Sequence, residues 1–263
     1  MRAAARTLRL LALVRRTPPP KLQTTTLWYH PSQQYGEEVM GDPRFEGRTP
    51  AYVIWNLVQR YTREGDLVVD PFAGGGTTLD VARSLGRAAR GFDIAPARED
   101  IERADARELP LVDESVDFFF LDPPYSSHLD YAKGGAAREG DIGALDAFGP
   151  DYFDALETVF AELERCLKDR RYLAVYVSDT FKKKKGFVGI GARLFVQLER
   201  RFRPVDHVAV VRGSRKLEKP RFHRVAEEEN FFLRGFNHLL IFKKEENAPR
   251  RRGGRGDSRR GTT

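Results

Sequence analysis

Short apolar runs that end at aspartate alternate with stretches of helical periodicity along most of this chain. Three predicted strands follow this pattern, each given with the aspartate that follows it: Leu67–Val69 with Asp70, Ala88–Phe92 (with Arg90 as its one charge) with Asp93, and Val116–Leu121 (with Asp117 as its one charge) with Asp122. Short continuous apolar runs are typical of strands buried on both faces, as in parallel sheets. The order strand, helix, strand, helix therefore predicts an α/β fold with a mostly parallel sheet and helices on both faces.

The same reading assigns the remaining elements. Helices are expected over 52–61, 77–85, 152–167 and 194–202, and further strands over 101–104, 172–177, 205–211 and 236–242. Gly86 stands just past the second helix, where a glycine commonly ends a helix. Only residues 95–100 precede the third strand, so the crossover helix there is expected to be truncated. The last two strands are close enough in sequence to pair antiparallel, which gives a seven-stranded sheet with an antiparallel last strand.

The net charge of +7 over 263 residues is concentrated at the two ends. Residues 1–22 carry six basic side chains and no acid, and residues 246–263 carry six arginines against two acids, which leaves −3 for residues 23–245. We therefore expect a basic N-terminal extension over 1–22, a folded domain over 23–245, and a disordered Arg/Gly-rich tail over 246–263. Basic arms of this kind favour nucleic acid as a partner.

Composition also excludes several classes of protein. No apolar run approaches the roughly 20 residues that span a bilayer, so no membrane partner is expected. The single cysteine, Cys166, rules out an internal disulfide and a cysteine-based zinc cluster, and no metal is expected. The Arg-rich, acid-free N-terminus is compatible with an organelle transit peptide, but it lacks serine and stops at Pro18–Pro20. A cytoplasmic, nucleoid-associated location is favoured.

A glycine-rich loop follows the first predicted strand, in the sequence Asp70-Pro71-Phe72-Ala73-Gly74-Gly75-Gly76-Thr77-Thr78. Ligands of open α/β sheets bind beyond the carboxyl ends of the strands, and glycines let a ligand approach the bare backbone. The loop is not a phosphate-binding P-loop, because no Gly-Lys-Ser/Thr follows. It does not match the dinucleotide fingerprint either, whose third glycine would fall at Leu79.

A second motif, Asp122-Pro123-Pro124-Tyr125, ends the apolar run over 116–121. It places a carboxylate, a rigid pair of backbone carbonyls and an aromatic ring at one strand end, since proline fixes φ. That combination suits a flat ring that carries an amino group.

Together the two motifs resemble the amino-methyltransferases, which transfer a methyl group from S-adenosylmethionine to an exocyclic nitrogen of adenine or cytosine. The resemblance covers residues 47–243 and implies a Rossmann-like class I methyltransferase fold; Gly75 stands where the family often has serine. It implies that the glycine loop surrounds the methionine half of the cofactor, that Asp93 accepts ribose hydroxyls and that Asp105 accepts the adenine amino group. Residues 47–50 resemble an upstream motif that helps hold the methionine carboxylate. The cofactor-binding residues implied are Asp70, Pro71, Phe72, Gly74, Gly76, Thr77, Asp93, Ile94, Asp105 and Ala106.

The resemblance implies that Asp122, Pro123, Pro124 and Tyr125 are the catalytic residues. Asp122 and a carbonyl near Pro123 would accept hydrogen bonds from the amino group, and Tyr125 would stack on the base. In a duplex the base must first be flipped out of the stack.

The substrate is expected to be DNA, with N4-cytosine or N6-adenine as the target atom. Asp122 in place of asparagine argues against the protein-glutamine methyltransferases of similar fold. Little room remains for target recognition outside residues 126–149 and the basic segment 212–224, where Phe222 is available to stack. Nucleic-acid contacts are predicted at Lys182, Lys183, Arg212, Arg215, Lys216, Lys219 and Arg221. An RNA base methyltransferase and a non-catalytic nucleic-acid binder are the two alternatives.

Overall fold

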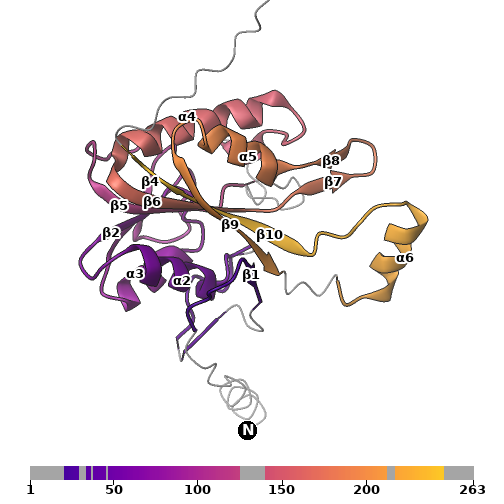
Figure 1. Ribbon diagram of the computed structural model, residues 1–263, viewed down its shortest axis with the longest axis horizontal. Helices are drawn as coiled ribbons and strands as arrows, with labels where there is room; N and C mark the ends of the chain where they lie inside the picture. Colours follow the sequence, from indigo (N-terminus) through magenta and orange to yellow (C-terminus); the bar gives the residue numbers. More distant parts are fainter. Residues whose placement is uncertain are drawn as a thin grey trace, which may run out of the picture.

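A mixed sheet with helices on both faces forms the protein (Figure 1). The computed structural model describes residues 21–29, 34–36, 38–45, 47–124, 140–211 and 217–245. Eight strands form the main sheet, in the order β1-β9-β10-β6-β5-β2-β3-β4. Their bounds are β1 Leu27–Trp28, β2 Leu67–Asp70, β3 Ala88–Asp93, β4 Ile101–Arg103, β5 Val116–Leu121, β6 Leu167–Val177, β9 Arg203–Val211 and β10 Phe236–Lys243.

Only β10 runs against the other strands of this sheet in the part of the chain that the structure describes. It pairs antiparallel with both β6 and β9, whereas the remaining pairs are parallel. The predicted mostly parallel sheet with an antiparallel last strand is confirmed. The sheet has one strand more than the seven predicted, because the two residues of β1 add to its edge beside β9. A two-residue strand is too short to give a sequence pattern.

Helices cover the two faces because strand residues alternate between them. Phe118 and Phe120 of β5 pack against α2 (Ala51–Tyr61) and α3 (Thr77–Ser84). Phe119 and Leu121, which point the other way, pack against α4 (Pro150–Cys166) and α5 (Ile190–Leu198). All six residues of β5 are buried, as expected for a central strand. The single cysteine, Cys166, is also buried.

Several predicted boundaries were wrong. β6 begins at Leu167, directly after α4, and not at 172; the charged residues 168–171 hid its first half, where the pairing with β5 shifts register. The helix predicted over 194–202 is α5, which spans Ile190–Leu198. Its start was missed because Gly189 and Gly191 interrupt the helical pattern. No helix lies between β3 and β4, residues 94–100 being described throughout, so the truncated crossover is confirmed.

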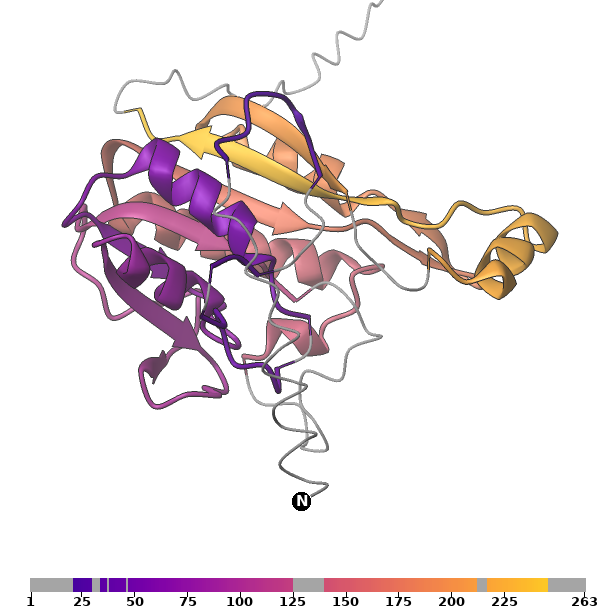
Figure 2. The same cartoon turned by 90° about the horizontal axis from the view of Figure 1, so that it is seen from below.

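A protruding unit follows the carboxyl ends of β6 and β9. It contains the hairpin of β7 (Thr180–Lys182) and β8 (Gly186–Val188), and the helix α6 (Pro220–Glu228). Seen from below, α6 lies far from the sheet at the end of this extension (Figure 2). Part of the predicted basic loop 212–224 is therefore helical, because Pro220 occupies the first turn, where proline favours helix initiation.

The remaining described element is the short 3-10 helix η1 (Ile142–Ala144), between β5 and α4. Residues 1–20 and 246–263 lie outside the described part of the chain, so the predicted extension and tail stay predictions. No helix among the described residues is long and apolar enough to cross a membrane.

Candidate active site

The carboxyl ends of neighbouring parallel strands bring three predicted site residues to one edge of the sheet. Asp70 ends β2, Asp93 ends β3 beside it, and Asp122 follows β5 on the other side of β2. Asp105 follows β4, the next strand along. All four carboxylates thus follow the carboxyl ends of neighbouring parallel strands.

Asp70 is enclosed at the start of the glycine loop. Its side chain is buried; the Phe72 N–H donates to Oδ1 at 3.0 Å and the Thr78 hydroxyl donates to Oδ2 at 2.5 Å. Burial raises the pKa of Asp70 to about 7, although the hydrogen bonds from Thr78 and Phe72 act in the opposite direction. Asp70 thus joins the beginning of the loop to the first turn of α3.

The loop itself depends on glycine at two positions. Gly74 has φ of 46° and Gly76, the residue before α3, has φ of 78°, a left-handed region that favours glycine. The Gly74 N–H donates to Oδ2 of Asp93 at 2.9 Å, and the Ala95 N–H donates to Oδ1 at 2.9 Å. Asp93 therefore connects the β2 loop to the β3 loop, and a carboxylate retains acceptor capacity after two such bonds.

Asp105 has a partner that the sequence prediction missed. Arg107 donates a bidentate pair of hydrogen bonds to the Asp105 carboxylate, with Nη2 at 2.6 Å from Oδ2 and Nε at 3.0 Å from Oδ1. Burial alone would raise the pKa of Asp105, but the hydrogen bonds from Arg107 outweigh burial and lower it. Asp105 is thus held ionised beside Gly140. The buried Ala106 lies between the two charged residues.

The segment before α2 packs onto the glycine loop. The Asp42 N–H donates to the Gly75 carbonyl at 2.8 Å. A Cβ at Gly74 or Gly75 would lie 2.8 or 2.9 Å from side-chain atoms of Phe45. Phe45 therefore fixes the outer side of the loop, a contact that no sequence motif indicated.

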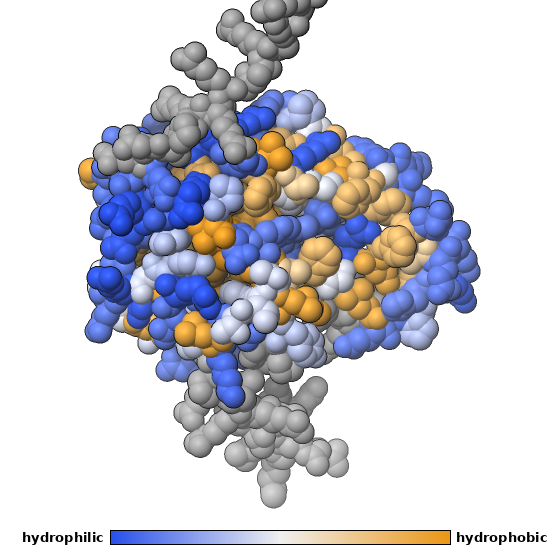
Figure 3. Space-filling view, viewed as in Figure 1, coloured by the Kyte–Doolittle hydropathy of each residue, from blue (hydrophilic) through white to orange (hydrophobic). Residues whose placement is uncertain are grey.

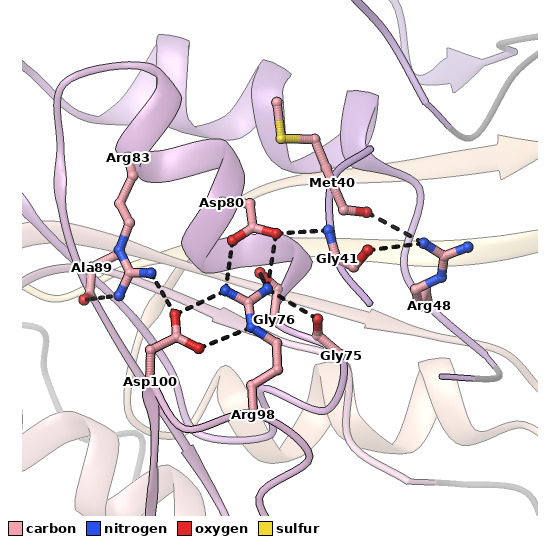
Figure 4. A network of polar contacts seen from close by, with 10 residues as sticks. All are labelled: Met40, Gly41, Arg48, Gly75, Gly76, Asp80, Arg83, Ala89, Arg98 and Asp100. Atoms are coloured by element: carbon pink, nitrogen blue, oxygen red, sulfur yellow. Dashed lines mark hydrogen bonds and ion pairs between the residues drawn. The ribbon is translucent and has the colours of Figure 1, made fainter. Parts of the chain in front are cut away.

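Arg98 is the centre of a polar network behind the loop (Figure 4). Its guanidinium contacts Asp80 twice at 2.8 Å and Asp100 at 2.8 and 2.9 Å, and it reaches the Gly75 and Gly76 carbonyls at 3.3 and 3.4 Å. The hydrogen bonds that Arg98 donates to Asp80 and Asp100, above all those to Asp80, raise the pKa of Arg98. The network anchors the loop to α3 and to the segment after β3.

The upstream motif at 47–50 contacts two neighbouring segments of the site. Arg48 donates to the carbonyls of Met40 and Gly41 at 3.4 and 3.2 Å. The hydroxyl of Thr49, which is buried, donates to Oδ2 of Asp122 at 2.5 Å. The motif thus reaches the D-P-P-Y strand end as well as the glycine loop.

Asp122 is half-buried, and Pro123 after it is buried. Leu121 pairs with Val175, so the residue after it stands beside β6 at the rim of the sheet. Tyr125 lies outside the described residues, as do Arg212, Arg215 and Lys216, so their predicted roles stay predictions.

The remaining predicted nucleic-acid contacts lie on the protruding unit. Lys182 Nζ stands 5.1 Å from the Phe148 ring centroid, and Lys183 pairs with Glu229 at 2.7 Å. Lys219 precedes α6, and Arg221 lies on α6. No cluster of metal-ligating side chains is present among the described residues.

Part of the chain is similar to known methyltransferases. Residues 12–103 match the DNA methylase family. This match contains the glycine loop, Arg98 and Asp93, and it ends before the D-P-P-Y motif. The chain is also similar to the Type II methyltransferase M2.DpnII of Streptococcus pneumoniae, with 46% identity over 44 residues, which is 17% of this chain and 16% of that protein. The chain thus spans about one sixth of that relative's length in the match.

Similar solved structures include methyltransferases. An S-adenosylmethionine-dependent methyltransferase of Methanosarcina mazei has a TM-score of 0.45 at 14% identity, covering 72% of this chain and 97% of that one. Geranyl diphosphate C-methyltransferase of Streptomyces coelicolor has a TM-score of 0.48 at 12% identity, covering 78% and 86%. Scores below 0.5 are too low to define the fold, which rests on the strand order and the antiparallel β10. This mostly parallel α/β sheet with an antiparallel last strand is the fold that the resemblance implied.

Proposed function

We propose that this protein transfers a methyl group from S-adenosylmethionine to the exocyclic amino group of cytosine or adenine in DNA. The observation that carries the proposal is the placement of Asp122, half-buried at the end of β5, next to the strand that bears the glycine loop. The family match over residues 12–103 supports a DNA substrate.

The residues at the strand ends would bind the cofactor. Gly74, Gly76 and Thr77 would border its methionine half with bare backbone, and Asp93 and Asp105 would accept hydrogen bonds from its adenosine half. Asp70, with Pro71 and Phe72, would act by shaping the loop, because its carboxyl is already bonded to Phe72 and Thr78. Ile94 and Ala106 would flank the adenosine half as neighbours of the two acceptors.

Bound S-adenosylmethionine would supply an electrophilic methyl group. The amino nitrogen of a base is a poor nucleophile because its lone pair is delocalised into the ring. Asp122 and a carbonyl at Pro123 or Pro124 would accept hydrogen bonds from its two N–H groups and turn the lone pair out of the ring plane. As the nitrogen–methyl bond forms and the sulfur–methyl bond breaks, S-adenosylhomocysteine would leave and the nitrogen would release one proton to Asp122 or to solvent. Tyr125 would stack on the base, and Thr49 would hold the Asp122 carboxylate in position. Alignment of the amino nitrogen with the methyl group would then supply much of the rate acceleration.

The test is transfer of isotope-labelled methyl to matched total DNA and total RNA, followed by mass spectrometry of the nucleosides. We expect label in N4-methylcytosine or N6-methyladenine of DNA. Asp122→Ala should lower transfer by at least about 100-fold, since it removes the acceptor that orients the amino group, while cofactor affinity stays within about twofold.

The other outcomes separate the alternatives. Label confined to RNA would make the protein an RNA base methyltransferase, the reading that the Arg/Gly-rich segment 249–256 favours. Cofactor binding that is lost in Gly74→Arg, without methylation of either nucleic acid, would indicate a non-catalytic binder. Loss of cofactor binding in Asp122→Ala would show that the site is assigned wrongly.

A further inference from the structure

The protruding unit leaves the sheet at the same edge as Asp122. We define the arm as residues 180–188 and 217–234, which contain β7, β8 and α6. β7 follows the carboxyl end of β6, and α6 is inserted between the carboxyl end of β9 and the start of β10. Since β6 pairs with β5, the arm extends from the rim on which Asp122 lies (Figures 1 and 2).

The two halves of the arm are joined to each other. The Phe181 ring of the hairpin stacks on Phe231, which follows α6, with centroids 4.8 Å apart and planes at 13°. Lys183 and Glu229 form an ion pair at 2.7 Å across the same junction. The hairpin and α6 therefore present one surface to a partner.

That surface carries exposed aromatic rings with an arginine between them. Phe232 is 87% exposed and Phe187 is 57% exposed. The Arg234 guanidinium lies 5.2 Å from the Phe187 ring centroid and donates to the Phe232 carbonyl. We call Phe187, Phe232 and Arg234 the aromatic platform. Large exposed rings are costly in water, so a grouping of this kind indicates a binding surface.

The charge of the arm decides the kind of partner. Its eight lysines and arginines stand against four glutamates, a net charge of +4. Residues 23–245 sum to −3, so the rest of the domain carries −7. Lys184, Lys219 and Arg221 have no acidic partner among the described residues. A lysine-rich surface is unusual in protein–protein interfaces, whereas cations interleaved with aromatic rings are typical of single-stranded nucleic-acid sites.

In the space-filling view, apolar side chains gather where the arm joins the body, and hydrophilic residues cover its tip (Figure 3). A strand of nucleic acid that crosses this surface toward Asp122 would place bases on the apolar part and phosphates along the cations.

We propose that the arm binds the DNA strand that flanks the target base as unpaired DNA, and this rests on the proposed function. The aromatic platform stacks on a base of that strand, and Lys184, Lys219 and Arg221 contact its phosphates. The enzyme thereby favours targets whose neighbouring bases are unpaired.

The test is fluorescence anisotropy of the full chain with a labelled single-stranded DNA of mixed sequence, its duplex, and RNA of the same sequence. Phe232→Ala should weaken binding of single-stranded DNA about tenfold, and Phe187→Ala somewhat less. Lys184→Ala should weaken it about threefold and make the slope of log affinity against log salt shallower by about 0.7. Val112→Ala is the matched control: Val112 is 76% exposed, precedes β5 at the opposite edge, and should change nothing.

Equal affinity of wild type and Phe232→Ala for single-stranded DNA would overturn the proposal. A loss of affinity in Phe232→Ala for duplex DNA or RNA alone would also overturn it. A change in sedimentation without any change in DNA binding would overturn it as well, and would make the platform a contact between copies of the chain. The measurement needs no methyl transfer. If no nucleic acid is methylated but Phe232→Ala still loses binding, the catalytic proposal fails and the arm proposal stands.

Discussion

The dipeptide Asp-Pro occurs at the carboxyl ends of two neighbouring strands, β2 and β5, but the two aspartates differ in burial and in their hydrogen-bond partners. At the end of β2, Asp70 is 4% exposed and bonded to Phe72 and Thr78, both within eight residues of it. At the end of β5, Asp122 is half-buried, and it accepts a hydrogen bond from Thr49, which lies 73 residues away. Asp70, whose partners are local, shapes the glycine loop. Asp122, whose partner is distant in sequence, lies at the rim of the sheet, where its carboxylate can contact a substrate.

The first way to test this contrast is the pH dependence of stability. Burial raises the pKa of Asp70 to about 7, whereas an aspartate in the unfolded chain has a pKa near 4. The folded state therefore holds this proton more tightly, so stability should fall as pH rises from about 4 to about 7 and then level off. The fall attributable to Asp70 is on the order of 4 kcal/mol at most, from about 1.4 kcal/mol for each pKa unit.

Urea denaturation of wild type and Asp70→Asn between about pH 5 and pH 8 isolates this effect, because asparagine keeps the shape and loses the titration. The two stability curves should diverge as pH rises, with the variant gaining relative to wild type. Parallel curves would mean that Asp70 does not titrate in this range.

A second prediction concerns the local hydrogen bonds of Asp70. Asp70→Ala leaves the Thr78 hydroxyl and the Phe72 N–H without their acceptor, which should lower the free energy of unfolding by about 1–3 kcal/mol. The comparison belongs near pH 5, where the folded-state carboxyl is protonated and no buried charge is relieved. Asp70→Asn is the control and should recover most of the loss; equal destabilisation by both would contradict a hydrogen-bonding role.

A third prediction concerns Thr49 and distinguishes a role at Asp122 from a role at the methionine carboxylate of the cofactor. Thr49→Val should lower kcat about tenfold, because it removes the hydroxyl that donates to Asp122, and should leave cofactor affinity unchanged. Thr49→Ser, which restores the hydroxyl, should recover activity in the same methyl-transfer assay. Weaker cofactor binding with an unchanged kcat would instead support the role at the methionine carboxylate that the resemblance implied.

The sequence predicted the fold well where the apolar pattern is unbroken. β5 was predicted to the residue, because all six of its positions are buried and five of them are apolar, Asp117 being the exception. The first half of β6 was missed because it carries a run of charges, and α6 was missed because the basic composition of 212–224 resembled a loop. In both cases the missed residues are mostly charged because they lie at the solvent-exposed surface of the element, so they do not show the apolar pattern of a buried strand or helix.

For the site, the sequence by itself determined which residue types stand at each strand end, because aspartates and glycines that follow buried strands must meet at one edge of a parallel sheet. It could not determine which carboxylate is enclosed and which stays at the rim. The tertiary structure decided that: Asp70 finds its partners within its own loop, Arg107 neutralises Asp105, and Thr49 reaches Asp122 from the start of α2. Pairings across 73 residues depend on how the helices pack onto the sheet, and packing is a property of the whole chain.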